Sequence, residues 1–212
     1  MPVYALVGNK GGAGKTTLSV NLASGLAKQA SIAVVDADPQ GSALQWRAFS
    51  ENENTMPVFE AGEQLEHQAR ELLKDYEYVL FDCPPSVHAP QTISVLEFCD
   101  IALIPVQPSP MDLWATIHIE EAVSHARKIN ETLRAMLVIN QLESRTTLSR
   151  IVRDAVSEIG LPVANTALRR RAIYRSAALE GKSVFDVGRR GADATSELEQ
   201  LIEEIVNHGQ QR

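Results

Sequence analysis

The sequence has few cysteines and no long apolar run, and both features limit the classes of protein it can belong to. Its 212 residues include only Cys83 and Cys99, whose separation matches no common metal-ligand spacing. We expect both to be core thiols, which agrees with a cytoplasmic location. No apolar run reaches 18 residues, so no membrane-spanning helix is predicted. The first residues lack a basic segment followed by an apolar one, so we expect no signal peptide.

Positive charge is scarce overall but concentrated in one region. The net charge of −7 argues against a general nucleic-acid binder. Segment 145–190, however, has ten Lys/Arg and four Asp/Glu. Its arginines predict a patch that contacts DNA phosphates without sequence preference. The alternative is a solvated face, or ion pairs with the acidic remainder of the chain. The candidate DNA-binding residues are Arg169, Arg170, Arg171, Arg175, Arg189 and Arg190.

Short apolar segments alternate with helical segments along most of the chain, which predicts an α/β fold with a mostly parallel central sheet flanked by helices. The sequence has no internal repeat, low-complexity tract or clear linker, so we expect one domain over residues 1–212. The predicted strands are 3–7, 32–36, 57–60, 78–82, 101–106 and 135–140. The predicted helices are 16–29, 42–50, 64–74, 90–98, 113–130, 148–159 and 192–208.

The segment GNKGGAGKTT, between the first strand and the first helix, is typical of a phosphate-binding loop. The strict pattern fails because Asn9 occupies its first glycine position. The three glycines still allow backbone N–H groups to turn toward phosphates, and the helix adds its positive dipole end. Lys15 is expected to reach the β- and γ-phosphates, and the Thr16 hydroxyl to bind Mg²⁺. The predicted nucleotide contacts in this loop are Lys10, Gly11, Gly12, Ala13, Gly14, Lys15, Thr16 and Thr17.

Acidic residues follow two of the predicted buried strands. Asp36 and Asp38 lie at the end of strand 32–36, and Asp82 lies at the end of strand 78–82. The carboxyl ends of parallel strands meet at the edge where α/β sheets bind ligands. These aspartates therefore predict a magnesium–nucleotide site, although either strand-end aspartate taken alone could be a helix cap or a turn residue.

Three motifs together, KGGAGKTT, DADPQGS and FDCPPS, resemble the ParA/MinD family of deviant Walker ATPases, which has the P-loop NTPase fold of three layers. The resemblance covers nearly the whole chain. It implies ATP and Mg²⁺ as ligands. It also implies that Lys10 is the signature lysine, which crosses the interface of an ATP-sandwiched dimer, rather than an ordinary surface lysine. A cation supplied in this way would act like an arginine finger.

The resemblance assigns further roles at the same site. Asp38 matches the residue that orients the attacking water. Asp36 and Asp82 match acids that hold magnesium, largely through its waters. Asn140 matches a position associated with adenine, and Pro108 belongs to a proline-rich turn that could form a wall of the base pocket. A purely structural role is the alternative for both adenine assignments.

Within the family, the segment RRRAIYRSAALEGKSVFD is similar to the small ParA-type, ParF-like partition and positioning ATPases. Larger ParA proteins carry an N-terminal helix-turn-helix domain, which we do not expect here. Membrane-attached MinD-like proteins use a basic amphipathic C-terminal helix, whereas this C-terminal helix has an acidic polar face. An iron–sulfur role would need a second suitably placed cysteine. We therefore predict no membrane partner and no cluster.

The resemblance implies a switch whose ATP state is a homodimer bound to nucleoid DNA in the cytoplasm. A cargo-bound, ParB-like adaptor would stimulate otherwise slow hydrolysis, and the cargo would be a plasmid, a chromosome or a protein organelle. The alternative is a MinD-like or metabolic ATPase that acts on a membrane, a protein or a small molecule without DNA.

Overall fold

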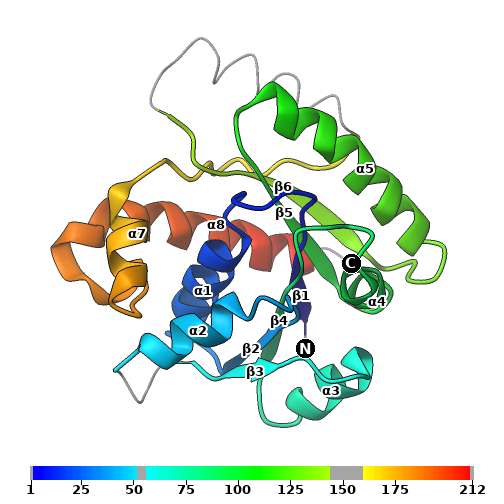
Figure 1. The fold of residues 1–212 in the computed structure, drawn as a ribbon, viewed down its shortest axis with the longest axis horizontal. Coiled ribbons are helices and arrows are strands. Elements are labelled where there is room, and N and C mark those ends of the chain that lie inside the picture. The colour runs from blue at the N-terminus through cyan, green and yellow to red at the C-terminus, as the bar shows by residue number, and fades with distance from the viewer. Residues whose placement is uncertain (1, 52–55, 144–159, 211–212) are drawn as a thin grey trace.

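A computed structural model describes residues 2–51, 56–143 and 160–210, and its centre is one sheet of six strands (Figure 1). The strand order is β3-β2-β4-β1-β5-β6, and all neighbouring pairs are parallel. The strands are β1 (Val3–Leu6), β2 (Ile32–Asp36), β3 (Val58–Glu60), β4 (Tyr78–Asp82), β5 (Ile101–Val106) and β6 (Arg134–Ile139).

Helices cover both faces of the sheet, which explains why the strands are apolar without alternation. Successive residues enter different cores: Ala5 packs on one side and Leu6 on the other. One core lies under α3 (Leu65–Leu72), α4 (Pro90–Leu96) and α5 (Pro110–Ala126). The other lies under α1 (Lys15–Leu26), α2 (Ser42–Phe49), α7 (Ala172–Leu179) and α8 (Ala192–Gln210).

The predicted fold class is confirmed, and every predicted strand is present with ends displaced by at most one residue. The predicted helix 148–159 lies outside the described residues. One helix was missed, because α7 falls within the segment that we interpreted only as a basic block. It spans eight residues, and Ala177 is the one among them that is fully buried.

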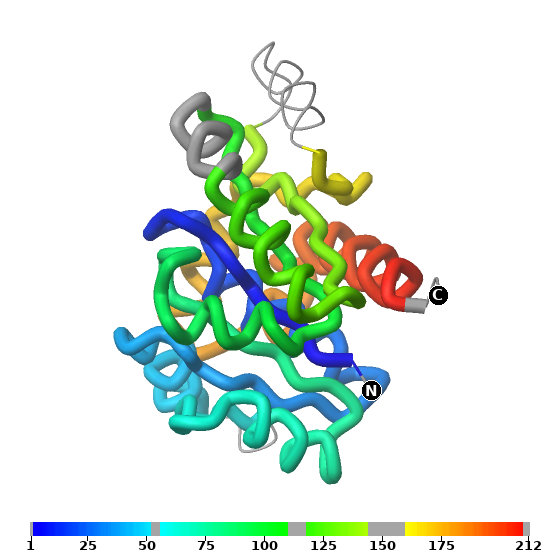
Figure 2. Tube along the Cα trace, turned by 90° about the vertical axis from the view of Figure 1, so that its right-hand side faces the viewer, coloured from blue at the N-terminus to red at the C-terminus, as the bar shows by residue number. Residues whose placement is uncertain are grey.

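Parallel strands bring their carboxyl ends to one edge, and β1 marks the point where the chain changes direction across the sheet. Its neighbours are β4 on one side and β5 on the other. Ligands of open α/β sheets bind outside such a switch point. The opposite edge holds the start of β1 and the end of α8, which lie near each other in both views (Figures 1 and 2). There the Arg134 guanidinium donates a hydrogen bond to the His208 carbonyl.

Candidate nucleotide-binding site

The loop between β1 and α1 has the backbone conformation that a phosphate-binding loop requires. Gly12 and Gly14 have φ angles of 80° and 91°, a left-handed conformation that glycine adopts without steric cost. Helix α1 then begins at Lys15. The unpaired N–H groups of its first turn and the positive end of its dipole therefore face the site, where they favour an anion.

Lys15 is buried, whereas Lys10 is exposed near the tip of the loop. Burial lowers the pKa of the Lys15 ammonium, and the nearby carboxylates of Asp82 and Asp38 oppose this shift. The structure gives Lys15 no ion pair within residues 2–51, 56–143 and 160–210. A bound phosphate would supply the negative charge that this buried cation needs.

Asp82 is fully buried at the end of β4, and one of its oxygens is unpaired. Its Oδ1 accepts a hydrogen bond of 3.0 Å from the Ser19 hydroxyl, while Oδ2 has no partner among the described residues. Burial raises the pKa of Asp82 to about 6, and the nearby Thr16 and Ser19 hydroxyls oppose the shift. An orphaned carboxylate oxygen beside Thr16 suits a magnesium-bound water. Ser19 was not predicted from the sequence, since nothing in the motif marks it.

Asp36 acts as a helix cap in this structure, which is the alternative that the sequence left open. Its Oδ2 accepts the backbone N–H groups of Ala43 and Leu44 at 2.8 and 3.0 Å, in the first turn of α2. Its Oδ1 accepts the N–H of Asp38 at 3.2 Å. Burial raises the pKa of Asp36, and these backbone hydrogen bonds oppose that effect. The carboxylate thus ties β2 to α2 and shapes the turn that carries Asp38.

Asp38 lies half-buried in that turn, close enough to influence Lys15 electrostatically. Its Oδ1 accepts the Gln40 N–H at 3.0 Å, and its backbone carbonyl accepts the Gly41 N–H at 2.8 Å. The second carboxylate oxygen has no hydrogen bond in the described part of the chain, so it is available to a water molecule. The structure therefore brings together the loop, Asp38 and Asp82, as the motifs predict.

Three side chains that directly follow β5 and β6 contact the loop. The Asn140 side chain donates a hydrogen bond of 2.8 Å to the Ala13 carbonyl. Gln107 and Gln141, which sequence reasoning did not assign, both donate to the Gly12 carbonyl, at 2.6 and 3.2 Å. Both residues lie just after the carboxyl ends of β5 and β6, and this position in the sequence could have identified them as candidates.

A cavity opens beside the first turn of α1, and basic residues form much of its wall. Pro108 is not among the residues that line it. The cavity is lined by Gly14, Thr17, Leu18, Asn140, Gln141, Leu168, Arg169, Arg170, Arg171, Tyr174 and Arg175. Several predicted DNA-binding arginines therefore lie at the mouth of the nucleotide site.

The six candidate arginines differ in their partners. Arg171 is mostly buried and bonds to Asp193 at 2.9 Å and Glu197 at 2.6 Å, and the Glu197 hydrogen bond raises its pKa. Arg169 pairs with the same Glu197 at 3.6 Å, and Arg170 pairs with Glu143 at 2.8 Å. These three have the ion pairs that the sequence left as the alternative.

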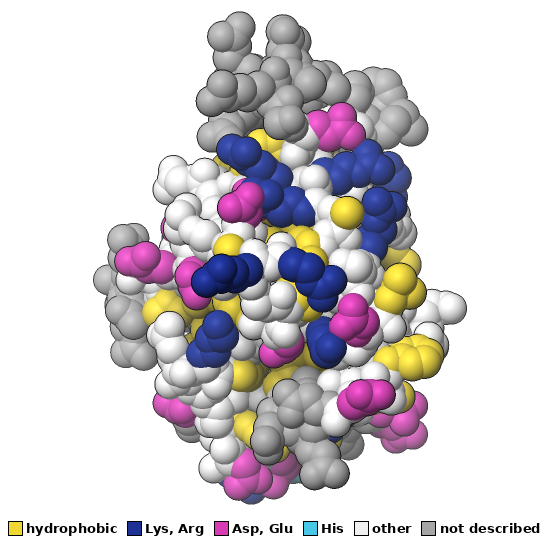
Figure 3. Space-filling view, turned by 90° about the vertical axis from the view of Figure 1, so that its left-hand side faces the viewer, with side chains coloured by type: hydrophobic (Ala, Val, Ile, Leu, Met, Phe, Trp, Pro, Cys, Tyr) yellow, Lys and Arg dark blue, Asp and Glu magenta, His cyan; other side chains and the backbone are white. Residues whose placement is uncertain are grey.

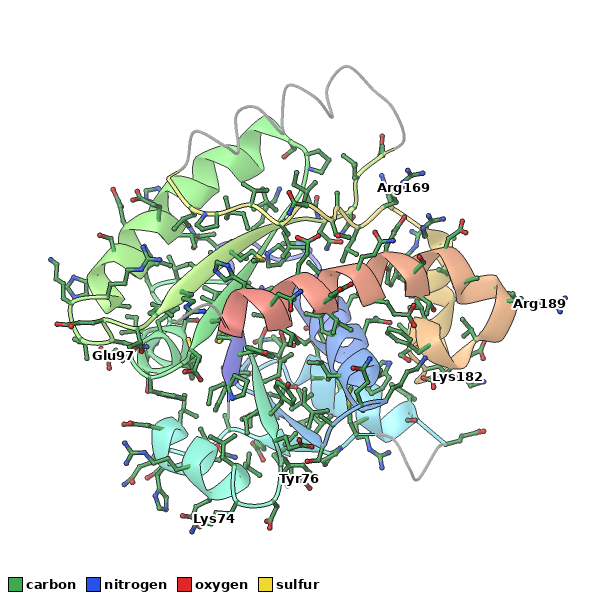
Figure 4. The ribbon with its side chains drawn as sticks, turned by 180° about the vertical axis from the view of Figure 1, so that it is seen from behind. Lys74, Tyr76, Glu97, Arg169, Lys182 and Arg189 are labelled. Atoms are coloured by element: carbon green, nitrogen blue, oxygen red, sulfur yellow. The ribbon has the colours of Figure 1, made fainter. Side chains whose placement is uncertain are left out.

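The remaining three arginines have weaker ion pairs or none among the described residues, so their guanidinium groups are more available to a ligand. Arg190 has only a 4.0 Å contact with Glu180. Arg175 and Arg189 are exposed and have no ion pair with any described residue. Figure 3 shows basic side chains interspersed with acidic ones on the face that carries α7, and Figure 4 shows Arg189 pointing away from the fold.

Other chemistry has little support in the part of the chain that is described. Cys83 and Cys99 are both buried and unpaired, and burial raises the pKa of both thiols. No group of three or more His, Cys, Asp or Glu side chains there could hold a metal ion by itself. None of the described helices is both long and apolar enough to cross a membrane.

Comparison with known proteins gives consistent matches over most of the chain. Residues 4–184 match the CobQ/CobB/MinD/ParA nucleotide binding domain. The chain is 40% identical over 205 residues to maintenance of carboxysome distribution protein A of Halothiobacillus neapolitanus, covering 95% of each protein. The protein of that name from Gloeobacter kilaueensis is 30% identical, covering 96% of this chain and 93% of the relative.

A solved structure has the same fold. An ATP complex of McdA from Cyanothece superposes with a TM-score of 0.79 at 17% identity, covering 98% of this chain and 96% of that one. At this identity the superposition bears on the fold alone.

Proposed function

Because the chain belongs to the ParA/MinD family of deviant Walker ATPases, we propose that it is an ATP-dependent dimerising switch that positions a cargo on non-specific DNA. The observation that carries this proposal is the difference in burial between the two lysines of one loop. Lys15 is buried, whereas Lys10 is exposed. Lys15 would therefore bind the nucleotide of its own subunit, and Lys10 would reach the nucleotide of a second copy. A single phosphate-binding loop needs only the first of these lysines.

The described residues fit a magnesium–nucleotide complex. Asp82 has a buried, orphaned oxygen, and Thr16 lies next to it at the start of α1. These two residues would hold the ion. Asp36 would instead serve to cap α2. When bound, Mg²⁺ would neutralise charge on the phosphate oxygens. Lys15 and the loop N–H groups would bind those oxygens directly and hold the nucleotide in place.

Hydrolysis would depend on a correctly formed dimer. Asp38 would orient the attacking water, and Lys10 of the partner subunit would stabilise negative charge that develops on the transferred phosphoryl group. Neither residue is buried in the monomer. An isolated subunit should therefore turn over slowly, and a cargo-bound adaptor of the ParB type would accelerate hydrolysis by improving the geometry of the interface.

DNA binding would use the arginines that remain available for phosphates. Arg175 and Arg189 are exposed without ion-pair partners among the described residues, and Arg190 has only a long contact. Pairing two such surfaces in a dimer would raise the affinity steeply, because the second surface binds at high effective concentration. The net charge of −7 would keep the monomer weakly associated with DNA.

The cargo that we favour is a carboxysome. Two relatives with at least 30% identity over nearly the whole chain are both maintenance of carboxysome distribution proteins. We therefore place this protein in the cytoplasm, on the nucleoid in its ATP state. A plasmid or a chromosome would use the same switch, and the adaptor would decide between them.

Binding to random-sequence duplex DNA, measured with ATP and with ADP at moderate salt, tests the proposal. We expect tight binding only with ATP. Equal or absent binding in both states, with hydrolysis intact, would contradict it. That result would favour the alternative ATPase that acts on a membrane, a protein or a small molecule, in which the arginines serve only ion pairs such as Arg171–Glu197.

A further inference from the structure

Three side-chain amides hold the outer side of the phosphate-binding loop. Gln107 Nε2 lies 2.6 Å and Gln141 Nε2 lies 3.2 Å from the carbonyl oxygen of Gly12. Asn140 Nδ2 lies 2.8 Å from the carbonyl oxygen of Ala13. Two consecutive carbonyls thus receive three donors, each at 3.2 Å or less.

These donors come from the carboxyl ends of two neighbouring strands. Gln107 directly follows β5, and Asn140 and Gln141 directly follow β6. Gln141 has a φ of 56°, an uncommon value for a residue with a side chain. Its backbone N–H donates to Asn140 Oδ1 at 2.9 Å, so the Asn140 side chain is held by the Gln141 backbone as well as by the loop. The local strain at Gln141 is offset by contacts that direct both side chains to the loop.

The carbonyls that are held determine where the N–H groups point. In a planar trans peptide, C=O and N–H point in opposite directions. Fixing the Gly12 carbonyl toward Gln107 and Gln141 therefore aims the Ala13 N–H at the opposite side of the loop. Fixing the Ala13 carbonyl aims the Gly14 N–H in the same way. That opposite side is where the phosphates of a nucleotide would lie.

The loop needs such external restraints because its glycines supply few of their own. Gly14 also has to be a glycine for Asn140 to approach. A Cβ atom at Gly14 would lie 2.5 Å from Asn140 Nδ2, closer than real contacts allow. The absence of a side chain at Gly14 is therefore what allows Asn140 to come close enough to hydrogen-bond to the Ala13 carbonyl.

We propose that Gln107, Asn140 and Gln141 form an amide clamp that preorganises the phosphate-binding loop. They are positioning residues, because they act through the loop backbone. The inference rests on the nucleotide binding assumed in the proposed function and assigns Asn140 to the phosphates rather than to adenine. Preorganised N–H groups bind phosphate without first losing conformational freedom, so removing the clamp should weaken binding of every nucleotide equally.

The test replaces the two glutamines with methionine, which has a similar length and no donor. Gln107 and Gln141 are half-buried, so Gln107→Met, Gln141→Met and the double variant should fold. The matched control is Gln68→Met, since Gln68 Nε2 donates to the Glu60 carbonyl at 2.8 Å in a region remote from the loop. Dissociation constants are measured for ATP, GTP and inorganic tripolyphosphate, each with Mg²⁺, together with the melting temperature of each variant.

We expect each single change to weaken ATP binding by ~5-fold and the double change by ~20-fold, as the loss of one or two neutral hydrogen bonds implies. GTP and tripolyphosphate should weaken by the same factors. KM should rise while kcat at saturating ATP stays within ~2-fold, because the bound nucleotide itself then holds the loop. Gln68→Met should change neither parameter.

Two results would overturn the clamp. Unchanged affinities in the double variant would mean that the loop needs no such restraint. A changed ATP-to-GTP ratio with unchanged tripolyphosphate binding would mean that the amides read the base. If the unmodified protein binds no nucleotide at all, the proposed function fails instead.

Discussion

The nucleotide site and the basic surface around α7 are both rich in charge, but their charged side chains differ in whether they already have partners. In the site, Lys15 and Asp82 are buried and each keeps an unused capacity for a ligand. On the surface, Arg171 is fully engaged by Asp193 and Glu197. An unpaired charge costs free energy when it is buried, so the site favours a ligand that supplies the missing partners for these charges. Arg175 and Arg189 nearby are exposed and have no ion pair with a described residue, so they can bind phosphates without giving up an existing partner.

The largest effect that would test this contrast is expected at Lys15. Lys15→Ala should abolish ATP binding, because it removes the one buried cation of the loop. We expect a loss of more than ~100-fold in affinity, measured by titration calorimetry, since a hydrogen bond to a charged group contributes about 1.5–3 kcal/mol and the buried positive charge is lost with it. Lys28→Ala, in the same helix region but remote from the loop, is the control. Retained tight binding would show that the loop has been misassigned.

Asp38 should affect hydrolysis without affecting binding. Asp38→Ala should retain ATP affinity and lower kcat by ~100-fold or more, the usual contribution of a residue that handles the attacking water. The ATP-bound dimer should then accumulate, which light scattering coupled to size-exclusion chromatography can detect. A variant that hydrolyses ATP at the normal rate would remove Asp38 from this role.

Asp82 should make the ligand-free protein sensitive to pH. Its pKa is raised to about 6 in the folded state, so between pH 4 and 6 the folded protein holds a proton that the unfolded chain releases. The free energy of unfolding should therefore fall as the pH rises through this window, by on the order of 2–3 kcal/mol from this group. Chemical denaturation of the protein and of Asp82→Asn at pH 4, 5, 6 and 7 measures it.

The difference between the two proteins isolates this carboxyl group from other titrating residues. Asp82→Asn should lack this decline and should be the more stable form at pH 7 without nucleotide. It should also bind Mg²⁺–ATP more weakly, because the ionised oxygen is lost. Parallel stability profiles for the two proteins would contradict a raised pKa.

The smallest effects are expected on the basic surface, and they should divide the arginines into two groups. Arg175→Ala and Arg189→Ala should each weaken ATP-dependent DNA binding by ~3- to 10-fold and reduce the slope of its salt dependence by about one. The protein's melting temperature should not change. Filter binding at several salt concentrations gives both quantities.

Arg171→Ala should instead lower stability, because it leaves Glu197 without its closest partner in a half-buried position. We expect a cost of about 1–2 kcal/mol in a denaturant titration, with DNA affinity nearly unchanged per folded molecule. The reverse pattern, with Arg171 controlling DNA binding and Arg189 controlling stability, would contradict the division drawn from the structure.

Local patterns were enough to predict the sheet, the phosphate-binding loop and the aspartates at the strand ends. Each of these depends on residues that are close together in the chain, such as the glycines before Lys15. Helix α7 was missed because its segment was interpreted only as a basic block, whereas in the fold Ile173 and Tyr174 pack against a distant core. The same limit applies to Asp36, whose capping of α2 depends on how the turn between them folds.

By itself, the sequence determined where the candidate site lies, because a loop of glycines with two lysines and a set of strand-end acids predicts a magnesium–nucleotide site through local geometry. Only the tertiary structure decided which side chains contact the loop and which arginines are paired. Asn140 reaches Ala13 across 127 positions of sequence, and Arg171 pairs with Glu197 across 26. Hydrogen bonds and ion pairs act over a few ångströms in space, so their partners depend on how the sheet and its helices pack.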